Sequence, residues 1–275
     1  MTTIHPTAII DPRAEIDEDV TIGPYCVIGP SVRIGAGTVL HNQVTISGMT
    51  TIGFDNEIFP YCVIGSVPQD LKYDGEQTRV IIGDRNQIRE HVTIHRGTPM
   101  GGGVTRVGDD NLFMVGVHIA HDCIVHGHTI LANNVMLAGH VVVHSGAGIG
   151  GGAGIHHFAT VGRLSFVGAM GRISKDVPPF MIVEGNPPAV RSLNTIGLMR
   201  RGFPERTMDA LKDAYKTLYR SNLTMKEAMA ELESRYPHIP EVRELCGAIR
   251  RSGEGAFGRF RETLRQDNKF RTHAR

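Results

Sequence analysis

The feature that most constrains this chain is a six-residue repeat of aliphatic side chains. Counting in sixes, an apolar residue recurs through residues 4–64, again through 82–94, and, after a shift of one residue, through 107–173. Four residues after most of these positions stands a small side chain, such as Cys26 or Ala147. A period of six matches neither the 3.6 of an α-helix nor the 2 of a simple strand. It is typical of a short strand and a turn that repeat as one face of a coil.

Three such faces make a triangular turn of roughly 18 residues, so we predict a mainly β protein, a parallel β-helix of about nine to ten coils. Glycine or a short polar residue often follows the aliphatic one, as in Ile22-Gly23 and Ile52-Gly53. Because a corner needs permissive backbone dihedrals, we expect these glycines at the corners. The period does not fix the hand of the coil, and right-handed crossovers are the general rule.

Two stretches abandon the repeat, near residues 66–81 and 96–106, and we expect both to be loops that project from the coil. Projecting loops on a rigid scaffold are common places for binding residues, although insertions without a function are about as common. After Pro178-Pro179 the repeat ends, and an amphipathic pattern over 205–219 predicts a helix.

The expected organisation is therefore a β-helix catalytic domain over 1–190 and a C-terminal α-helical domain over 191–275. Thr224 and Glu227 have the spacing of a capping box, and the Arg-rich tail from Ser252 is interpreted as a further helix.

Composition excludes several classes of protein. With 41% hydrophobic and 21% charged residues the chain is not disordered, and no apolar run approaches the roughly 18 residues of a membrane span, so we expect no membrane insertion. The first residues lack a basic segment followed by an apolar one, and the four cysteines show no CxxC pairing, so we expect a cytoplasmic protein with free thiols.

Charge is unevenly distributed along the chain. Residues 1–190 carry 11 basic and 17 acidic side chains, whereas residues 191–275 carry 18 and 11. The basic C-terminal part fits nucleic acid, an acidic protein or phosphates, so charge alone does not choose among these partners.

Histidine is the second unusual feature, because eight of the 14 histidines lie between His118 and His157. Residues 18 apart stack one coil above another at about 4.8 Å, which places His121, Gly139 and His157 in one column. A neutral imidazole beside an unhindered backbone N–H supplies a general base and an oxyanion donor, the two needs of acyl transfer. Asp122 is placed to orient the imidazole, provided that a corner lies at this point.

Metal binding is the competing use of clustered histidines. A zinc ion requires three or four ligands in tetrahedral reach, and His118, His121 and His126 have a suitable separation. The glycine-rich string 146–151 fits GxGxxG, but no strand-helix-strand unit surrounds it, so we interpret it as part of the repeat.

Several motifs are far more specific than the repeat. They are His118-Ile119-Ala120-His121-Asp122-Cys123, Leu131-Ala132-Asn133-Asn134, Leu137-Ala138-Gly139-His140, Gln69-Asp70-Leu71-Lys72-Tyr73 and Met199-Arg200-Arg201-Gly202-Phe203. With them, nearly the whole chain resembles the UDP-N-acetylglucosamine O-acyltransferases. The resemblance implies a left-handed β-helix and a homotrimer with sites between subunits. It also implies transfer of an (R)-3-hydroxyacyl group from acyl carrier protein to the glucosamine 3-hydroxyl of UDP-N-acetylglucosamine, the first step of lipid A biosynthesis, without a cofactor, a metal or a nucleic-acid partner.

The resemblance also assigns roles to individual residues. His121 is similar to the general base of the family, Asp122 to its orienting partner and Gly139 to the oxyanion donor. Nine further positions resemble substrate-binding residues: Asp70, Lys72, His95, His118, His140, His156, Asn194, Arg200 and Arg201. Of these, Asp70 is expected to hold the sugar, and His118, His140 and His156 are expected to line the substrate cleft. Lys72 and His95 are expected to bind substrate or place the acyl donor. Asn194, Arg200 and Arg201 are expected to approach the nucleotide and its phosphates. The basic C-terminal part is expected to attract the acidic carrier protein.

Two positions depart from the family pattern. Ile196 replaces an acidic residue near the nucleotide, which puts that contact in doubt. Ala169 stands where glycine accompanies a deep acyl pocket and methionine a shallow one, so we expect an acyl chain of intermediate length. The sequence leaves open whether the acceptor carries a 3-hydroxyl or a 3-amino group. A zinc-dependent hexapeptide enzyme of the carbonic anhydrase type and a non-enzymatic binding scaffold are the alternative functions.

Overall fold

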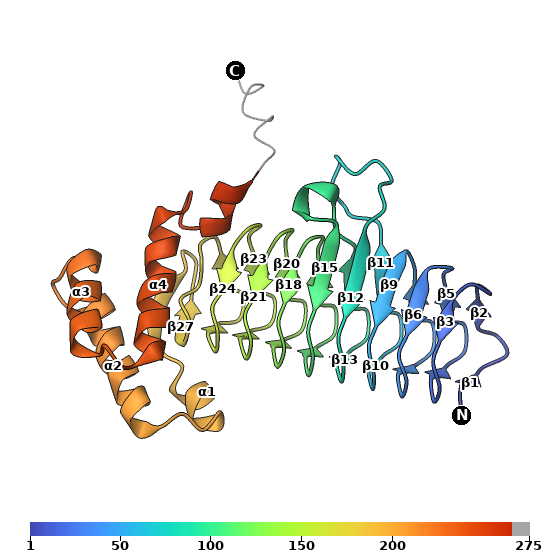
Figure 1. Ribbon diagram of the computed structural model, residues 1–275, viewed down its shortest axis with the longest axis horizontal. Helices are drawn as coiled ribbons and strands as arrows, with labels where there is room; N and C mark the ends of the chain where they lie inside the picture. The colour runs from blue at the N-terminus through green and yellow to red at the C-terminus, as the bar shows by residue number, and fades with distance from the viewer. Residues whose placement is uncertain (266–275) are drawn as a thin grey trace, which may run out of the picture.

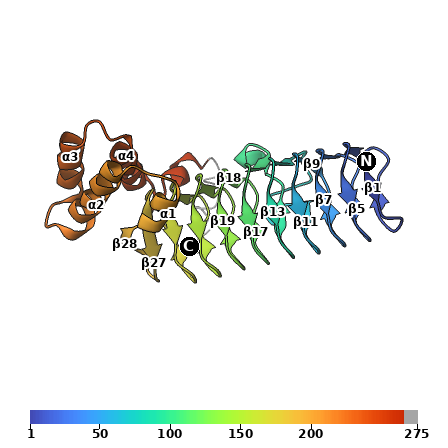
Figure 2. The same cartoon turned by 90° about the horizontal axis from the view of Figure 1, so that it is seen from below.

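The computed structural model describes residues 1–265 and shows a long stack of coils with helices at its C-terminal end (Figure 1). The coils run from β1 (Thr3–Ile4) to β26 (Arg172–Ile173), and Figure 2 shows the same stack from below. The architecture is a left-handed parallel β-helix followed by a small α-helical region, so the predicted fold class is confirmed.

Three sheets form the faces of the coil, and as far as β26 each is built from every third strand. Sheet A contains β1, β4 (Thr21–Ile22), β7 (Val39–Leu40), β10 (Glu57–Ile58), β13 (Gln87–Ile88), β16 (Leu112–Phe113), β19 (Ile130–Leu131), β22 (Gly148–Ile149), β25 (Phe166–Val167), β27 (Met181–Glu184) and β28 (Ala189–Leu193). Sheet B contains β2 (Ile9–Ile10), β5 (Val27–Ile28), β8 (Thr45–Ile46), β11 (Val63–Ser66), β14 (Thr93–His95), β17 (His118–Ile119), β20 (Met136–Leu137), β23 (Gly154–Ile155) and β26. Sheet C contains β3 (Glu15–Ile16), β6 (Val32–Ile34), β9 (Met49–Ile52), β12 (Arg79–Ile82), β15 (Val104–Val107), β18 (Ile124–Val125), β21 (Val142–Val143) and β24 (Thr160–Val161).

The strands of successive coils pair in parallel with the register that the repeat predicts. His118 lies opposite Met136, and Ile119 lies opposite Leu137, 18 residues further on. The aliphatic column fills the interior, and its members from Ile22 onward are almost entirely buried. Burial of this column is the main favourable contribution to folding. β27 and β28 pair antiparallel and close the end of sheet A.

We name the turns by the sheets that they join, as the A–B, B–C and C–A corners. At most corners the third residue after the aliphatic one has a positive φ, as at Tyr25 (59°) and His140 (64°). The prediction that the glycines directly after the aliphatic residues supply this conformation is wrong. Gly23 is required because a Cβ there would lie 2.7 Å from the carbonyl oxygen of His41 in the next coil. These glycines allow the coils to approach, whereas the left-handed corner position is taken by many residue types, from Gly37 to Tyr25.

Two segments leave the coil on the same side of the stack (Figure 1). The first connects β11 to β12, and the second connects β14 to β15 and contains the short 3₁₀ helix η1 (Pro99–Gly101). Ile82, before the second segment, pairs with Val107 after it. The loop therefore accommodates the shift of one residue in the repeat, and the column of buried aliphatic side chains stays continuous.

The helical region contains α1 (Thr195–Arg200), α2 (Glu205–Arg220), α3 (Met225–Arg235), α4 (Pro240–Glu254) and the 3₁₀ helix η2 (Phe260–Leu264). The predicted capping box is present, because Thr224 accepts from the Glu227 N–H and the Glu227 carboxylate accepts from the Thr224 N–H. The α4 helix packs back toward the coils, where Arg163 forms an ion pair with Glu244 at 2.7 Å. None of the helices within residues 1–265 has the length and apolarity needed to cross a bilayer. The last ten residues of the Arg-rich tail lie outside the described residues.

Candidate active site

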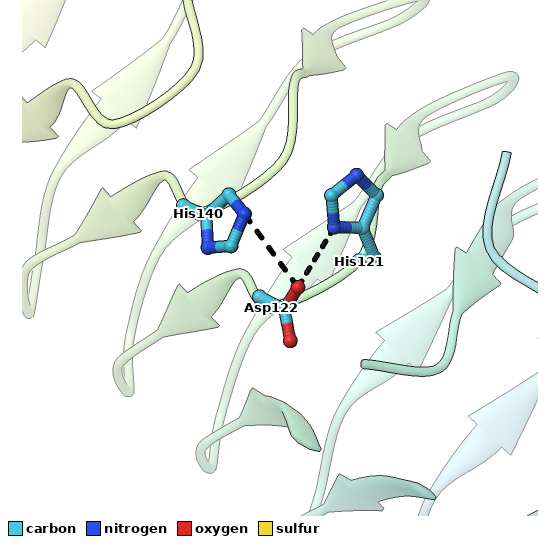
Figure 3. A group of neighbouring side chains, drawn as sticks. All are labelled: His121, Asp122 and His140. Atoms are coloured by element: carbon cyan, nitrogen blue, oxygen red, sulfur yellow. Dashed lines mark hydrogen bonds and ion pairs between the residues drawn. The ribbon is translucent and has the colours of Figure 1, made fainter. Parts of the chain in front are cut away.

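His121 and Asp122 form a hydrogen-bonded pair at the B–C corner that follows β17. Asp122 occupies the positive-φ position (60°), which turns its side chain back toward the imidazole of its neighbour. The Nδ1 atom of His121 lies 2.8 Å from Oδ2 of Asp122 (Figure 3). Because a carboxylate oxygen accepts, Nδ1 carries the hydrogen and Nε2 keeps its lone pair. The corner on which the predicted role of Asp122 depends is therefore present.

The Asp122 carboxylate is held on its other side by Thr98, a residue that no motif in the sequence marks. The Thr98 N–H donates to Oδ1 at 2.8 Å, and its hydroxyl donates to Oδ2 at 2.6 Å. The Asp122 N–H donates in turn to Oγ1 of Thr105 at 2.9 Å. Both Thr98 and Asp122 are buried. The carboxylate is thus fixed in one orientation before any substrate binds.

Gly139 lies directly beside the His121 ring, in the column that the 18-residue register predicts. A Cβ built at Gly139 would lie 2.5 Å from Cε1 of His121, so only glycine leaves room for the ring. The main chains are tied together because the His140 N–H donates to the His121 carbonyl at 3.0 Å. The Gly139 N–H donates to no acceptor among the described residues.

His140 completes this group of side chains (Figure 3). Its Nε2 lies 3.7 Å from Oδ2 of Asp122, and its ring stacks on Phe158 with a centroid distance of 4.3 Å. The His121 and His140 rings stand perpendicular at 5.2 Å. His140 therefore lies at the same carboxylate as His121 but on the neighbouring coil.

Two cavities adjoin His121, one on each side of the corner. The smaller, about 300 Å³, is lined by the predicted residues Asp70, Lys72, Gly139 and His140. Asp70 and Lys72 come from the first projecting loop. The larger, about 610 Å³, extends along sheet B and is lined by the predicted residues His95, His118 and His156. Together with Asp122, these seven residues make eight predicted residues that a single chain gathers around His121.

Two of the sheet B histidines are held in the neutral form. The His95 and His118 rings meet edge to face at 4.9 Å, and Oγ1 of Thr93 lies 2.7 Å from Nδ1 of His118. Burial, reinforced by the neighbouring His118 and His121, lowers the pKa of His95 to about 4. Burial also lowers the pKa of His118. At neutral pH these rings therefore present polar but uncharged groups to the cavity.

The remaining predicted residues lie elsewhere on the same chain. Asn194 caps α1: its side chain accepts from the Gly197 N–H and donates to the Leu164 carbonyl. Arg201 reaches the His128 carbonyl at the C–A corner, with an Nη2 to O distance of 3.4 Å. Ala169 is exposed at an A–B corner. Arg200 is the last residue of α1 and directly precedes Arg201. Neither cavity at His121 is lined by Asn194, Arg200, Arg201 or Ala169.

The histidines proposed as zinc ligands do not come together. His126 stacks on His144 at 5.1 Å and lines a separate cavity of about 820 Å³ between sheet C and α4. Within residues 1–265, the group with metal-ligand spacing is instead His121, Asp122 and His140, whose ligand atoms lie within 4.8 Å of one another. The Asp122 carboxylate of this group accepts hydrogen bonds from Thr98 and His121.

Comparisons with known proteins show which family this chain resembles. A family model for bacterial hexapeptide transferases matches residues 1–35 and 13–48, and the model for domain 2 of UDP-N-acetylglucosamine O-acyltransferase matches residues 176–257. LpxA from Acinetobacter baumannii is 48% identical, with a TM-score of 0.85 over 88% of this chain and 95% of that one.

Two further solved structures show the same relationship. The UDP-N-acetylglucosamine O-acyltransferase of Moraxella catarrhalis is 45% identical, with a TM-score of 0.85 over 89% of this chain and 95% of that one. The UDP-N-acetylglucosamine acyltransferase of Bacteroides fragilis is 39% identical, with a TM-score of 0.87 over 90% and 97%. Identity at this level extends over both the coils and the helices, so the chain belongs to the UDP-N-acetylglucosamine O-acyltransferase family.

Proposed function

We propose that this protein transfers an (R)-3-hydroxyacyl group from acyl carrier protein to the glucosamine 3-hydroxyl of UDP-N-acetylglucosamine, the first step of lipid A biosynthesis. The observation that carries the proposal is the His121 to Asp122 hydrogen bond of 2.8 Å beside the open backbone of Gly139. Family membership supports the same reaction.

In this mechanism His121 acts as the general base through Nε2. The sugar hydroxyl gives its proton to Nε2 while its oxygen attacks the thioester carbonyl carbon and forms the new C–O bond. Asp122 holds the imidazole in the required tautomer and stabilises the imidazolium that forms. Collapse of the tetrahedral intermediate breaks the C–S bond, and the imidazolium returns the proton to the leaving thiolate.

Gly139 is proposed as the donor to the oxyanion of the tetrahedral intermediate. Its N–H belongs to the coil stacked on His121, so the base and the donor are held at a fixed separation by the solenoid backbone. A donor that is fixed before the reaction requires no reorganisation as charge develops.

The substrate-binding assignments follow the two cavities. Asp70 is proposed to hold the sugar and Lys72 to place a substrate from the smaller cavity, where His140 forms part of the wall. His95, His118 and His156 are proposed to line the larger one, where neutral rings favour contact with an uncharged acyl or sugar group. The β-helix, residues 1–190, is the proposed catalytic domain.

A homotrimer is proposed because one chain leaves the site incomplete. Asn194, Arg200 and Arg201 belong to a different region from His121, so we infer that they contact the nucleotide bound at His121 of another copy. Exposed apolar side chains along the A–B corner and the adjoining faces of sheets A and B favour contact between copies: Tyr25, Val27, Tyr61, Ile130, Met136, Phe166 and Met170.

The helical domain, residues 191–275, is proposed to attract the carrier protein through its excess of basic side chains. We also propose a cytoplasmic location, since Cys26, Cys62, Cys123 and Cys246 are buried free thiols that suit a reducing compartment.

The test is mass spectrometry of a reaction that contains the purified protein, UDP-N-acetylglucosamine and 3-hydroxyacyl carrier proteins of different chain lengths. A nucleotide sugar that is heavier by one hydroxyacyl group, and absent with His121→Ala, is the expected result. Because general-base assistance is worth about 10² to 10⁴ in rate, the variant should lose at least that factor while remaining folded.

Other outcomes discriminate among the alternatives. A product that forms only with the 3-amino analogue of the sugar would replace the hydroxyl acceptor with an amine. No product with either acceptor from folded protein would contradict acyl transfer and favour a binding scaffold or a zinc enzyme. Metal analysis of the same preparation separates those two, because a zinc enzyme would carry near-stoichiometric metal.

A further inference from the structure

The segment that follows α4 docks firmly against the last coils of the β-helix. The Asp176 carboxylate accepts from the Thr160 N–H at 2.7 Å and from the Phe260 N–H at 3.0 Å, so it joins sheet C to the start of η2. The Asp176 N–H donates to the Gly258 carbonyl at 2.8 Å. These bonds fix where the segment lies on the β-helix. The family model for domain 2 ends at residue 257, so η2 lies beyond the matched region.

Two charged residues hold the next turn of the segment. Arg259 is buried and donates to the Ser174 carbonyl at 2.6 Å, and its guanidinium also contacts the Glu262 carboxylate at 3.3 Å. Glu262 in turn lies 3.6 Å from Nε2 of His157, in the coil next to Gly139. Buried charges that pair with each other and with the main chain define a single position for η2.

As a result, Leu264 and Arg265 form one wall of the 300 Å³ cavity at His121. The Arg265 guanidinium lies 5.8 Å from the Phe158 ring centroid and 3.4 Å from Glu262, and about a third of the side chain is exposed. Lys72, from the projecting loop, lines the same cavity. Two cationic side chains, one from the first projecting loop and one from the segment after α4, therefore line the cavity beside the proposed base.

We propose that Arg265 binds a phosphate group of a substrate in this cavity. A guanidinium presents paired donors that match phosphate geometry. Among the described residues, the acidic side chain that lines this cavity is Asp70, whose carboxylate accepts from the main-chain N–H of Lys72. The Arg265 guanidinium is itself oriented by its contact with Glu262.

This inference rests on the proposed function, in which both substrates carry phosphate. One source is the diphosphate of the nucleotide sugar, and the other is the phosphate of the pantetheine arm of the carrier protein. The shared chemistry is a phosphate anion, and the test identifies its source.

The experiment compares Arg265→Ala with the full-length wild-type protein in steady-state kinetics. Loss of one charged hydrogen bond to phosphate is expected to raise one KM by roughly tenfold while kcat stays within about twofold. If the phosphate belongs to the carrier arm, the KM for the acyl carrier protein rises, and the variant no longer distinguishes acyl-phosphopantetheine from acyl-pantetheine. If it belongs to the nucleotide, the KM for UDP-N-acetylglucosamine rises instead.

Two further variants control the result. Arg265→Lys keeps the charge and is expected to recover part of the lost affinity. Arg33→Ala removes an exposed arginine of β6 that pairs with Glu15 outside these cavities and outside the helical domain, and it is expected to leave both KM values unchanged. Unchanged KM values for both substrates in Arg265→Ala would overturn the inference.

Failure of the proposed function is distinguishable from failure of this inference. An inactive wild-type protein would contradict the former alone, because calorimetric titration of UDP and of phosphopantetheine into wild type and Arg265→Ala still reports phosphate binding. Equal dissociation constants for both proteins with both probes would overturn the role of Arg265.

Discussion

The hydroxyl of Thr98 donates to Oδ2 of Asp122 at 2.6 Å, although Thr98 belongs to the loop of the preceding coil. The same oxygen accepts from Nδ1 of His121 at 2.8 Å. Gly101 lies against this carboxylate as well, since a Cβ there would meet the Asp122 side chain. The second projecting loop therefore positions the partner of the proposed base, in addition to shaping the cavity.

Removing the Thr98 hydroxyl is expected to slow turnover without weakening substrate binding. Thr98→Val keeps the main-chain N–H and the side-chain volume but leaves Oδ2 with one donor fewer, so Asp122 holds the imidazole less firmly. We expect kcat to fall by about tenfold, the equivalent of one hydrogen bond to a charged group, with KM values unchanged. Thr98→Ser restores the hydroxyl and should restore most of kcat. A proportional rise in KM with unchanged kcat would contradict a positioning role.

Gly139→Ala tests the close packing of the base against the neighbouring coil. The added Cβ would lie 2.5 Å from the His121 ring, so the ring has to move away from the donor N–H. We expect kcat to fall by at least about 100-fold, since positioning and oxyanion contacts are both disturbed. Gly253→Ala is the matched control, because a Cβ there meets nothing within 4 Å. It should leave kcat unchanged and stabilise α4 slightly. Equal activity in both variants would remove Gly139 from the site.

The repeat predicted the relationship between His121 and Gly139 because the coil fixes which residues stack. Once the period was known, a separation of 18 residues was enough to place the two in contact. The same logic failed for Thr98 and Arg265. Both belong to segments without a period, and their positions depend on long-range hydrogen bonds to Asp122 and Asp176 that no spacing reveals.

The corner glycines show a second limit of the sequence. Gly23 marks a close approach between coils, while the left-handed position falls on residues as large as Tyr25. The order of residues does not distinguish the position of close approach from the position of positive φ, because both lie within four residues of the same aliphatic side chain. The contacts proposed for Arg200 and Arg201 cannot be derived from the spacing of residues within one chain, because they depend on another copy of the chain.

The neutral state of His95 predicts a loss of stability in acid. Its pKa is about 4 in the folded protein and 6.5 as the ordinary value, so the unfolded chain binds more protons between these limits. Unfolding free energy therefore falls as pH decreases from 6.5 toward 4, by roughly 2 kcal/mol at pH 5 from this residue. Urea denaturation at pH 7.5 and pH 5 should show a smaller drop for His95→Gln than for wild type. An identical drop would contradict the burial of a neutral imidazole.

Mixing two inactive variants tests whether sites form between copies. In one variant His121→Ala removes the base, and in the other Arg200→Ala and Arg201→Ala remove the nucleotide contacts. If each site combines His121 of one copy with the arginines of the next, co-expressed oligomers with random composition should regain about a quarter of wild-type activity. The separately purified proteins, mixed without exchange of subunits, serve as the control. No recovery in co-purified oligomers would place both groups at sites within a single chain.

Ala169 is expected to set the length of the transferred acyl chain. Its side chain is exposed in the single chain, at an A–B corner beside Met170, so in the proposed trimer a neighbouring copy would close this part of the acyl pocket. Ala169→Gly removes a methyl group and should shift the preferred donor toward longer chains, whereas Ala169→Met should shift it toward shorter ones. Each buried methylene is worth about 0.8 kcal/mol, so kcat/KM for neighbouring even-numbered donors should change by roughly tenfold. The measurement is kcat/KM across a series of 3-hydroxyacyl carrier proteins, with the KM for UDP-N-acetylglucosamine as the internal control. If Ala169→Gly keeps the wild-type chain-length profile, the acyl pocket lies elsewhere.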